Sequence, residues 1–336
     1  MSKKSWNTNL RKANKVKNDE FYTQLSDIER ELGHYEEYFK WKTILCNCDD
    51  PRVSNFWHYF TKKFKSLGLK KVIATCYKNQ NINLFSSNNS EKAVYMEYFG
   101  DTNTNNIIDS SEINVIDLQG DGDFRSTECI ELLKQADIVV TNPPFSLFRE
   151  YVAQLIEYDK DFVIIGNQNA ITYKETFKLI KENKVWVWNT FPKEFQEPDG
   201  NIKKFWNICW FTNLDYRKRY QDIILYKKYN EIDYIQYYNY DAINIDKVKD
   251  IPLDYSWFMW VPITFLSNYN PNQFEIIGLG ISSSGIEIGV RPYTDEHKKY
   301  RKEIQKRGAV DGDLYIMKDG VVEVPYARIL IKNKKL

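Results

Sequence analysis

The sequence predicts an α/β fold in which an open sheet carries helices on both faces, followed by a mixed region that is rich in strands. Short runs of β-branched residues alternate with stretches of helical periodicity up to residue 185, and this order requires parallel strands joined by helices. Beyond residue 185 the helical patterns largely stop, and aromatic strand-like runs separated by turn signals take their place. The chain of 336 residues has room for about two domains.

Composition and charge narrow the class of protein. The formal net charge is +1, because 47 Lys and Arg face 46 Asp and Glu, so the whole molecule has no strong field toward polyanions or membranes. Any surface for nucleic acid must therefore be local. The five cysteines are an odd number, no secretory segment is recognisable, and no apolar run approaches the roughly 18 residues of a membrane span. We expect a soluble intracellular protein with reduced thiols.

The N-terminal part begins with a predicted flexible arm, residues 1–18, which contains six basic residues and no acidic one. A helix is predicted from Asp19, because apolar side chains recur at helical spacing. That apolar stripe consists of Phe21, Leu25, Ile28, Leu32, Tyr35 and Phe39. The core elements that follow are strands at 43–46, 71–75, 137–141 and 162–166 and helices at 53–67, 146–158 and 172–183. Residues 79–114 predict an irregular insertion or hairpin with one strand-like patch at 93–99.

The second region predicts strands, one charged helix and several turns. Strand-like runs lie at 205–212, 223–226, 261–266, 274–279 and 327–331, and the helix lies at 293–307. The predicted organisation is therefore an arm at 1–18, an α/β core at 19–185 and a strand-rich region at 186–336, whose late strands can rejoin the core sheet.

The sharpest chemical signal is Asn142-Pro-Pro-Phe145, which directly follows a predicted buried strand, where open α/β sheets keep their ligands. An amino group conjugated to an aromatic ring is a poor nucleophile. The amide oxygen of Asn142 and the carbonyl oxygen of Pro143 can each accept one of its hydrogens as charge develops. Pro143 and Pro144 fix the turn, and Phe145 offers a ring for stacking on a planar base. We predict a site for an amino group here; the alternative interpretation is a rigid turn without catalysis.

A second signal is the turn Gly120-Asp-Gly-Asp-Phe-Arg125. Its two glycines permit a tight bend. The pair Asp123 and Phe124 suits a purine, because the carboxylate can accept a hydrogen bond from the amino group while the ring packs on the face of the base. A surface turn with solvated carboxylates is the alternative interpretation. An EF-hand is disfavoured because its carboxylate ladder and final Glu are absent.

A third signal is Cys46-Asn-Cys-Asp-Asp-Pro51, which ends the first core strand, where a nucleotide-type cofactor would lie. The Gly-x-Gly-x-x-Gly fingerprint is missing, so pyrophosphate binding is disfavoured. Cys46 and Cys48 are favoured as structural thiols, since no second pair stands at zinc spacing. Asp49 and Asp50 are candidates for a cationic or hydroxyl-bearing cofactor.

Together these motifs resemble the EcoRI-type adenine-specific (N6) DNA methyltransferases of type II restriction-modification systems. The matching stretches, in one order along most of the chain, are 19–24, 46–56, 120–126, 141–150, 211–215, 240–243 and 261–265. The resemblance implies a Rossmann-like methyltransferase sheet and a target-recognition region at 186–336. It implies transfer of the methyl group of S-adenosylmethionine to N6 of a flipped adenine, with S-adenosylhomocysteine as product and no metal. The DNA site would be short, with an AATT-containing palindrome as first candidate, and its methylation would protect DNA from a cognate restriction enzyme.

The resemblance also implies roles for individual residues. Asn142, Pro143, Pro144 and Phe145 match the catalytic loop. The implied cofactor contacts are Phe21, Tyr22 and Thr23 at the methionine end, Cys48, Asp49 and Asp50 at the end of the first strand, and Asp123 and Phe124 at the adenine. Two features depart from most methyltransferases: the stretch 46–51 replaces a glycine-rich loop, and no acidic residue follows Thr75 to hold the ribose.

Local basic clusters supply the expected contacts with double-stranded DNA, namely Arg217, Lys218, Arg219, Lys298 and Lys299. We expect a monomer in the bacterial cytoplasm, associated with the nucleoid through DNA, without membrane contact, and paired with a restriction endonuclease in function but not physically. Within enzymes, the same loop also suits methylation of an RNA or protein amino group. From another class, the chain could be a non-catalytic DNA-binding protein with a degenerate methyltransferase core.

Overall fold

The computed structural model describes residues 22–48, 50–76, 93–105, 108–196 and 201–336. The expected arm at 1–18, Phe21 and Asp49 lie outside these ranges. The chain divides into two compact units: unit 1 is Met1–Ala170 with Val187–Leu214, and unit 2 is Ile171–Trp186 with Asp215–Leu336. The segment 187–214 thus belongs with the N-terminal sheet, and this division differs from the single boundary expected at residue 185.

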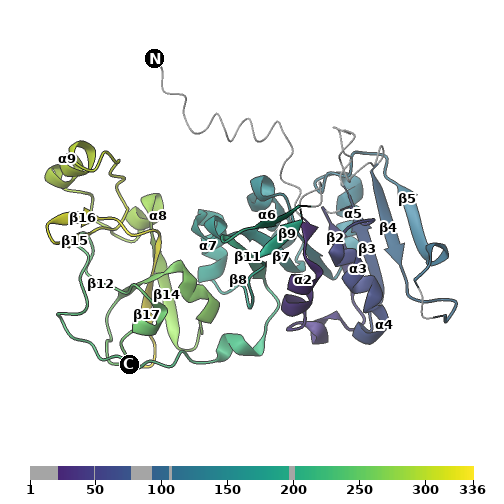
Figure 1. Ribbon diagram of the computed structural model, residues 1–336, viewed down its shortest axis with the longest axis horizontal. Coiled ribbons are helices and arrows are strands. Elements are labelled where there is room, and N and C mark those ends of the chain that lie inside the picture. The colour runs from purple at the N-terminus through teal and green to yellow at the C-terminus, as the bar shows by residue number, and fades with distance from the viewer. Residues whose placement is uncertain (1–21, 49, 77–92, 106–107, 197–200) are drawn as a thin grey trace, which may run out of the picture. The chain divides into compact units, whose positions relative to one another are not determined.

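The main sheet has eight described strands in the order β5-β4-β3-β2-β6-β7-β11-β8 (Figure 1). The strands are β2 (Thr43–Asn47), β3 (Lys71–Thr75), β4 (Val94–Tyr98), β5 (Ile113–Asp117), β6 (Ile138–Thr141), β7 (Asp161–Asn167), β8 (Trp186–Val187) and β11 (Ile208–Thr212). The connecting helices are α3 (Asn55–Lys62), α4 (Phe64–Leu67), α5 (Thr127–Gln135) and α6 (Phe148–Glu157). The α/β class predicted from the alternating pattern is confirmed, and two strands from beyond residue 185, β8 and β11, belong to the main sheet.

The register aligns the carboxyl ends of the central strands. Leu45 of β2 lies opposite Ile73 of β3 on one side and Val139 of β6 on the other, in parallel pairing. β6 pairs in parallel with β7. β4 is antiparallel to β3, and β5 is antiparallel to β4, so β5 runs in the direction of β2. The ends of β2, β3, β5, β6 and β7 therefore lie on one edge, called the carboxyl edge below.

The core strands are covered on both faces. Every residue of β2, β6 and β11 is buried. Successive side chains of a strand point to opposite faces, so uninterrupted burial requires a packed layer on each side. These β-branched and apolar runs are the reason that the sequence predicted the strands 43–46, 71–75, 137–141 and 162–166 correctly.

The predicted insertion at 79–114 contains a hairpin of the main sheet. The strand-like patch at 93–99 is β4, and it pairs with β5 as well as with β3. Residues 77–92 of the predicted insertion lie outside the described ranges.

The helix predicted from Asp19 is wrong at its start. Tyr22–Thr23 form strand β1, and helix α2 covers only Leu25–Leu32. β1 pairs with β9 (Glu194–Gln196), which pairs with β10 (Ile202–Lys204). The apolar stripe nevertheless enters the core, because the 3₁₀ helix η1 (Glu36–Phe39) continues it after Gly33: Ile28, Leu32, Tyr35 and Phe39 are all buried.

Unit 2 contains helix α7 (Lys174–Lys181), as predicted, and a sheet whose described strands have the order β12-β13-β17-β14. These strands are β12 (Ile243–Asn244), β13 (Met259–Pro262), β14 (Phe274–Gly280) and β17 (Arg328–Asn333). The remaining elements are helices α8 (Ser282–Glu287) and α9 (Asp295–Glu303) and the hairpin β15 (Ile316–Lys318) and β16 (Val321–Glu323). The core includes Trp260, Leu314 and Leu330.

Three predictions in this part of the chain need correction. Residues 223–226 form no strand. The run at 261–266 is a strand only as far as Pro262, because proline has no N–H to donate to a neighbouring strand. The chain then continues as the 3₁₀ helix η7 (Ile263–Asn268). The run at 205–212 pairs in the main sheet from Ile208 on, as β11. The strands at 274–279 and 327–331 and the charged helix are confirmed, although α9 is shorter than 293–307. No helix among the described residues is long and apolar enough to cross a membrane.

Candidate active site

The loop Asn142-Pro-Pro-Phe145 leaves the carboxyl edge at the end of β6. The hydroxyl of Thr141 donates a hydrogen bond to the backbone carbonyl of Asn47, the last residue of β2, and so ties the ends of two neighbouring strands. Asn142 and Pro143 are buried, whereas Pro144 and Phe145 are half-buried. The N–H of Leu147 donates to the carbonyl of Pro144 at 3.0 Å and closes the turn. The loop therefore places the buried Asn142 and the half-buried ring of Phe145 at the carboxyl edge.

The loop after β2 lies beside it. Cys48 is half-buried and has a φ of +86°, a conformation that turns the chain sharply away from the strand. Asp50 is buried, and its carboxylate accepts hydrogen bonds from Arg52, the shortest at 2.6 Å from Nη2. Asp50 thus holds the entry to α3 through a bidentate ion pair, which the sequence motif did not reveal.

The loop Gly120–Phe124 reaches the same edge. The N–H of Leu118 donates to the carbonyl of Ala93 at 2.9 Å. Gly122 has a φ of +80°, and a Cβ there would lie 2.3 Å from the carbonyl oxygen of Cys76, directly after β3. Only glycine allows this close approach, so Gly122 marks a tight bend, as predicted for this motif, whereas Gly120 has no positive φ.

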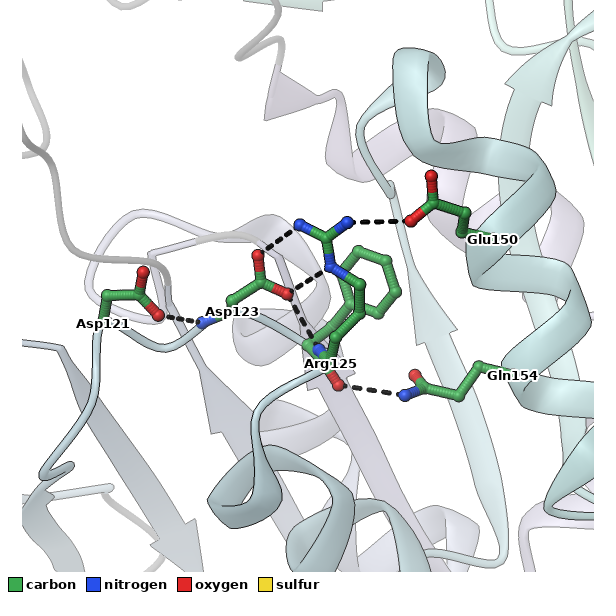
Figure 2. A network of polar contacts seen from close by, with 6 residues as sticks. Asp121, Asp123, Arg125, Glu150 and Gln154 are labelled. Atoms are coloured by element: carbon green, nitrogen blue, oxygen red, sulfur yellow. Dashed lines mark hydrogen bonds and ion pairs between the residues drawn. The ribbon is translucent and has the colours of Figure 1, made fainter.

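A polar network fixes the end of this loop (Figure 2). Asp123 accepts hydrogen bonds from Arg125 Nε at 2.9 Å and Nη2 at 2.7 Å, and Arg125 Nη1 donates to Glu150 of α6 at 2.8 Å. The hydrogen bonds from Arg125 hold the pKa of Asp123 below its ordinary value. The ring of Phe124 is buried and meets Tyr151 edge to face at 5.0 Å. The hydroxyl of Tyr151 donates to the side-chain oxygen of Asn47, so this packing leads back to the end of β2.

The segment Tyr22–Thr23 also lies near the loop after β2. Its backbone pairs with β9, and the side-chain amide of Asn55, the first residue of α3, donates to the carbonyl of Thr23 at 2.7 Å. The hydroxyl of Thr23 is buried and has no hydrogen-bond partner among the described residues. A buried hydroxyl without a protein partner is suited to a polar ligand group.

Two buried carboxylates on α2 hold the stretch 189–193 that leads into β9, the partner strand of Tyr22–Thr23, and no motif in the sequence indicated them. Glu31 accepts hydrogen bonds from the N–H groups of Asn189 and Thr190, and burial raises its pKa. Asp27 accepts from the N–H of Lys193 at 2.9 Å. The signal in the sequence was their spacing of four residues beside Ile28 and Leu32, which puts both acids on the buried face of the helix.

The basic cluster Arg217, Lys218 and Arg219 separates into two kinds of residue. Arg217 and Lys218 are exposed on the 3₁₀ helix η5 (Arg217–Tyr220). Arg219 is buried: its guanidinium lies 3.7 Å from the ring centre of Trp186, and Nη2 donates to Asn183 at 2.8 Å. On α9, Lys298 pairs with Asp311 at 3.1 Å. Lys299 is exposed on the same helix.

Within unit 1, the structure brings three expected groups to the carboxyl edge: the loop 142–145, the loop after β2 with Cys48 and Asp50, and the pair Asp123 and Phe124. Asn55 places Thr23 beside the second of these. The network partners Glu150 and Gln154 were not predicted, because they contact the motif only through the packing of α6.

Comparison with known proteins identifies the family. The family model described as adenine-specific methyltransferase EcoRI matches residues 9–334. The type II methyltransferase M.EcoRI of Escherichia coli is 47% identical over 356 aligned residues, which cover 100% of this chain and 99% of that relative. M.MpnI of Mycoplasma pneumoniae is 40% identical over 79% of this chain and 84% of its own length. M.MgeORF184P of Mycoplasma genitalium is 37% identical over the same shares.

No solved structure matches the chain significantly. The family match covers nearly the whole chain, and the full-length relative shares almost half of its residues. The chain therefore belongs to the EcoRI family of adenine-specific methyltransferases and is an enzyme that methylates adenine in DNA.

Proposed function

We propose that this enzyme transfers the methyl group of S-adenosylmethionine to N6 of an adenine that it flips out of a short DNA site. The observation that carries the proposal is the position of Asn142-Pro-Pro-Phe145 at the carboxyl edge, joined to the end of β2 by the Thr141–Asn47 hydrogen bond. Family membership supports adenine as the target base. The core is then a Rossmann-like methyltransferase sheet, since ligands of such sheets lie at this edge.

The catalytic loop acts by positioning and polarisation. The amide oxygen of Asn142 and the carbonyl oxygen of Pro143 accept the two hydrogens of the adenine amino group, which draws the nitrogen lone pair out of conjugation. Pro143 and Pro144 keep these acceptors in place, because both φ angles are fixed by their rings. The half-buried ring of Phe145 stacks on the extruded base.

The residues at the edge fit the cofactor. S-adenosylmethionine supplies an activated methyl group on a sulfonium centre. Thr23 offers a buried hydroxyl without a partner among the described residues, and Gly122 lets the loop 120–124 approach the end of β3 closely. We assign Thr23 and the loop at Cys48 to the methionine end of the cofactor and the loop with Asp123 and Phe124 to its adenine. The carboxylates of Asp50 and Asp123 are held by Arg52 and Arg125, so each acts from a fixed orientation.

DNA contact is assigned to exposed basic residues. Arg217, Lys218 and Lys299 are exposed and can neutralise phosphates, whereas the guanidinium of Arg219 is held in the interior of unit 2. The proposed site is a short palindrome with AATT as first candidate. Its methylation would protect DNA from a partner restriction endonuclease, with the enzyme acting as a monomer in the bacterial cytoplasm.

The test is incubation of the purified protein with tritiated S-adenosylmethionine and mixed genomic DNA, followed by nucleoside analysis and mapping of the modified positions. The expected result is N6-methyladenine at one short motif, with no label from the Asn142→Ala variant. Label in RNA or protein instead of DNA would overturn the assigned substrate. No label in any of the three would overturn the proposed reaction.

A further inference from the structure

We propose that Arg125 and Glu150 are positioning residues that couple the loop 120–124 to helix α6 and, through it, to the catalytic loop 142–145. The inference rests on the proposed function, because it assigns the first loop to the cofactor and the second to the target adenine. Neither residue contacts the reacting atoms in this assignment.

Arg125 joins two carboxylates from different elements (Figure 2). Its Nε and Nη2 donate to the two oxygens of Asp123 at 2.9 and 2.7 Å, and its backbone N–H donates to Asp123 Oδ1 at 2.9 Å. The third guanidinium nitrogen, Nη1, donates to Glu150 Oε2 at 2.8 Å. The planar guanidinium thus fixes the orientation of the Asp123 carboxylate and connects it to α6.

Helix α6 contacts the loop 120–124 at two further points. The side-chain amide of Gln154 donates to the carbonyl of Phe124 at 3.2 Å. The ring of Tyr151 packs against Phe124 with 5.0 Å between ring centres. Glu150 and Gln154 are four residues apart, so they lie on one face of the helix. One side of α6 is therefore shaped to hold the loop 120–124.

The same helix begins almost directly after the catalytic loop. Only the 3₁₀ helix η3 (Phe145–Leu147) separates Pro144 from Phe148, the first residue of α6. Because a hydrogen-bonded helix moves as a rigid body, a shift of its first turn displaces the residues before it. Glu150 lies in that first turn. The contact between Arg125 and Glu150 is thus placed where the position of the cofactor loop can be transmitted to Asn142.

The exposure of the pair argues that folding does not depend on it. The side chains of Arg125 and Glu150 are 49% and 58% exposed. Exposed ion pairs contribute little to folding stability, because water solvates both groups well when they separate. A change in this pair should therefore alter the geometry of the two loops more than the stability of unit 1.

The experiment compares Arg125→Met, Arg125→Lys, Glu150→Gln and the double variant Arg125→Met with Glu150→Gln in the full-length enzyme. Calorimetric titration gives the affinity for S-adenosylmethionine, steady-state kinetics with duplex DNA give kcat and KM, and thermal unfolding gives Tm. Lys134→Met is the matched control, because Lys134 forms a comparably exposed ion pair with Glu131 in α5.

We expect Arg125→Met to weaken cofactor binding about tenfold and Glu150→Gln to lower kcat about tenfold with less effect on cofactor affinity, as for other residues that hold reacting groups in place. Arg125→Lys should recover part of the loss, since an ammonium keeps the charge but not the bidentate contact. The double variant should lose less than the product of the two single effects. The Tm of every variant should stay close to that of the wild type and of Lys134→Met.

Wild-type cofactor affinity and kcat in both single variants, in an enzyme that methylates DNA, would overturn this inference alone. A fall in Tm that accounts for all lost activity would also overturn it, because the pair would then be structural. A wild-type protein that binds no S-adenosylmethionine and methylates nothing would overturn both this inference and the proposed function.

Discussion

The carboxylate of Glu31 accepts hydrogen bonds from both the backbone N–H and the hydroxyl of Thr190, each at 2.6 Å. Its other oxygen accepts from the N–H of Asn189 and the hydroxyl of Tyr35, each at 3.1 Å. One buried acid on α2 thereby satisfies four donors, two of them from the backbone between β8 and β9. Since β9 pairs with β1, Glu31 braces the segment that carries Thr23.

We expect Glu31→Gln to lower the free energy of unfolding by about 2–3 kcal/mol at neutral pH, because hydrogen bonds to a buried charged acceptor are lost. The NH₂ group of the glutamine would also face N–H and O–H donors that now point at a carboxylate oxygen. Chemical denaturation monitored by tryptophan fluorescence measures this. Glu29→Gln, an exposed position on the same helix, controls for the loss of a charge and should change stability little. Equal effects at the two positions would contradict the bracing role.

The stability contributed by Glu31 should also depend on pH. Burial raises its pKa in the folded state above the ordinary 4.5. A raised folded-state pKa means that the folded chain binds the proton more tightly, so the part of the stability that comes from this proton is fully present below about pH 4.5 and is lost as pH rises through the folded pKa. The hydrogen bonds that the side chain accepts remain at neutral pH and account for the loss expected there in Glu31→Gln. The stability of the wild type relative to Glu31→Gln should therefore decline as pH rises above 4.5. A difference that grows with pH would show that the pKa is lowered instead.

Gly122→Ala should disturb the loop 120–124 specifically. The new Cβ would lie 2.3 Å from the carbonyl oxygen of Cys76, and the φ of +80° is strained for any other residue. We expect a loss of roughly 1–3 kcal/mol in stability, from the strained backbone, together with weaker cofactor binding. Gly120→Ala is the matched control, because its Cβ would meet only the end of one side chain, the Glu128 carboxylate at 3.3 Å, and no backbone atom. Calorimetric titration of both variants with S-adenosylmethionine distinguishes them, and equal affinities would contradict the assigned role of this loop.

The basic cluster on η5 should divide by function. Arg217 and Lys218 are exposed. When both are replaced by Ala, the logarithm of the DNA-binding constant should fall less steeply with the logarithm of the salt concentration, by about 0.9 in slope for each lost phosphate contact. The Tm should not change. Arg219→Ala should instead cost about 2–3 kcal/mol of stability, because its guanidinium stacks on Trp186 and donates to Asn183. Fluorescence anisotropy with labelled duplex DNA and thermal unfolding measure the two effects. An unchanged salt slope in the double variant would remove Arg217 and Lys218 from the DNA surface.

Much of the core could be predicted because its signals are local. The runs at 43–46 and 137–141 are apolar along their whole length, and this pattern reports burial on both faces directly. The loop at Asn142 follows such a strand, so its place at the carboxyl edge also follows from local order. The bend at Gly122 was predictable for the same reason, since its positive φ is a local conformation that favours glycine.

The failures come from contacts between distant parts of the chain. Tyr22 and Thr23 lie within the helix predicted from Asp19, yet they pair with β9, whose residues lie beyond position 190. Arg219 is indistinguishable in the sequence from Arg217, and only the position of Trp186 makes it an interior residue. The role of Glu150 likewise depends on Arg125, 25 positions away. Pairing and packing partners of this kind leave no periodic trace in a single sequence.

The sharpest prediction concerns Asn142. Asn142→Ala should lower kcat by roughly 10²–10³, the usual effect of removing one polar group that acts on developing charge. Binding of DNA and of S-adenosylmethionine should persist, because Pro143, Phe145 and the cofactor loops remain. Asn142→Asp tests the reason: it retains oxygen acceptors for the adenine amino group, so it should keep more activity than the alanine variant. Single-turnover methylation of a duplex that carries the mapped site measures the chemical step. Near-normal turnover of Asn142→Ala would exclude the acceptor role, and an aspartate variant no better than alanine would show that charge or amide geometry, rather than an oxygen acceptor alone, decides the rate.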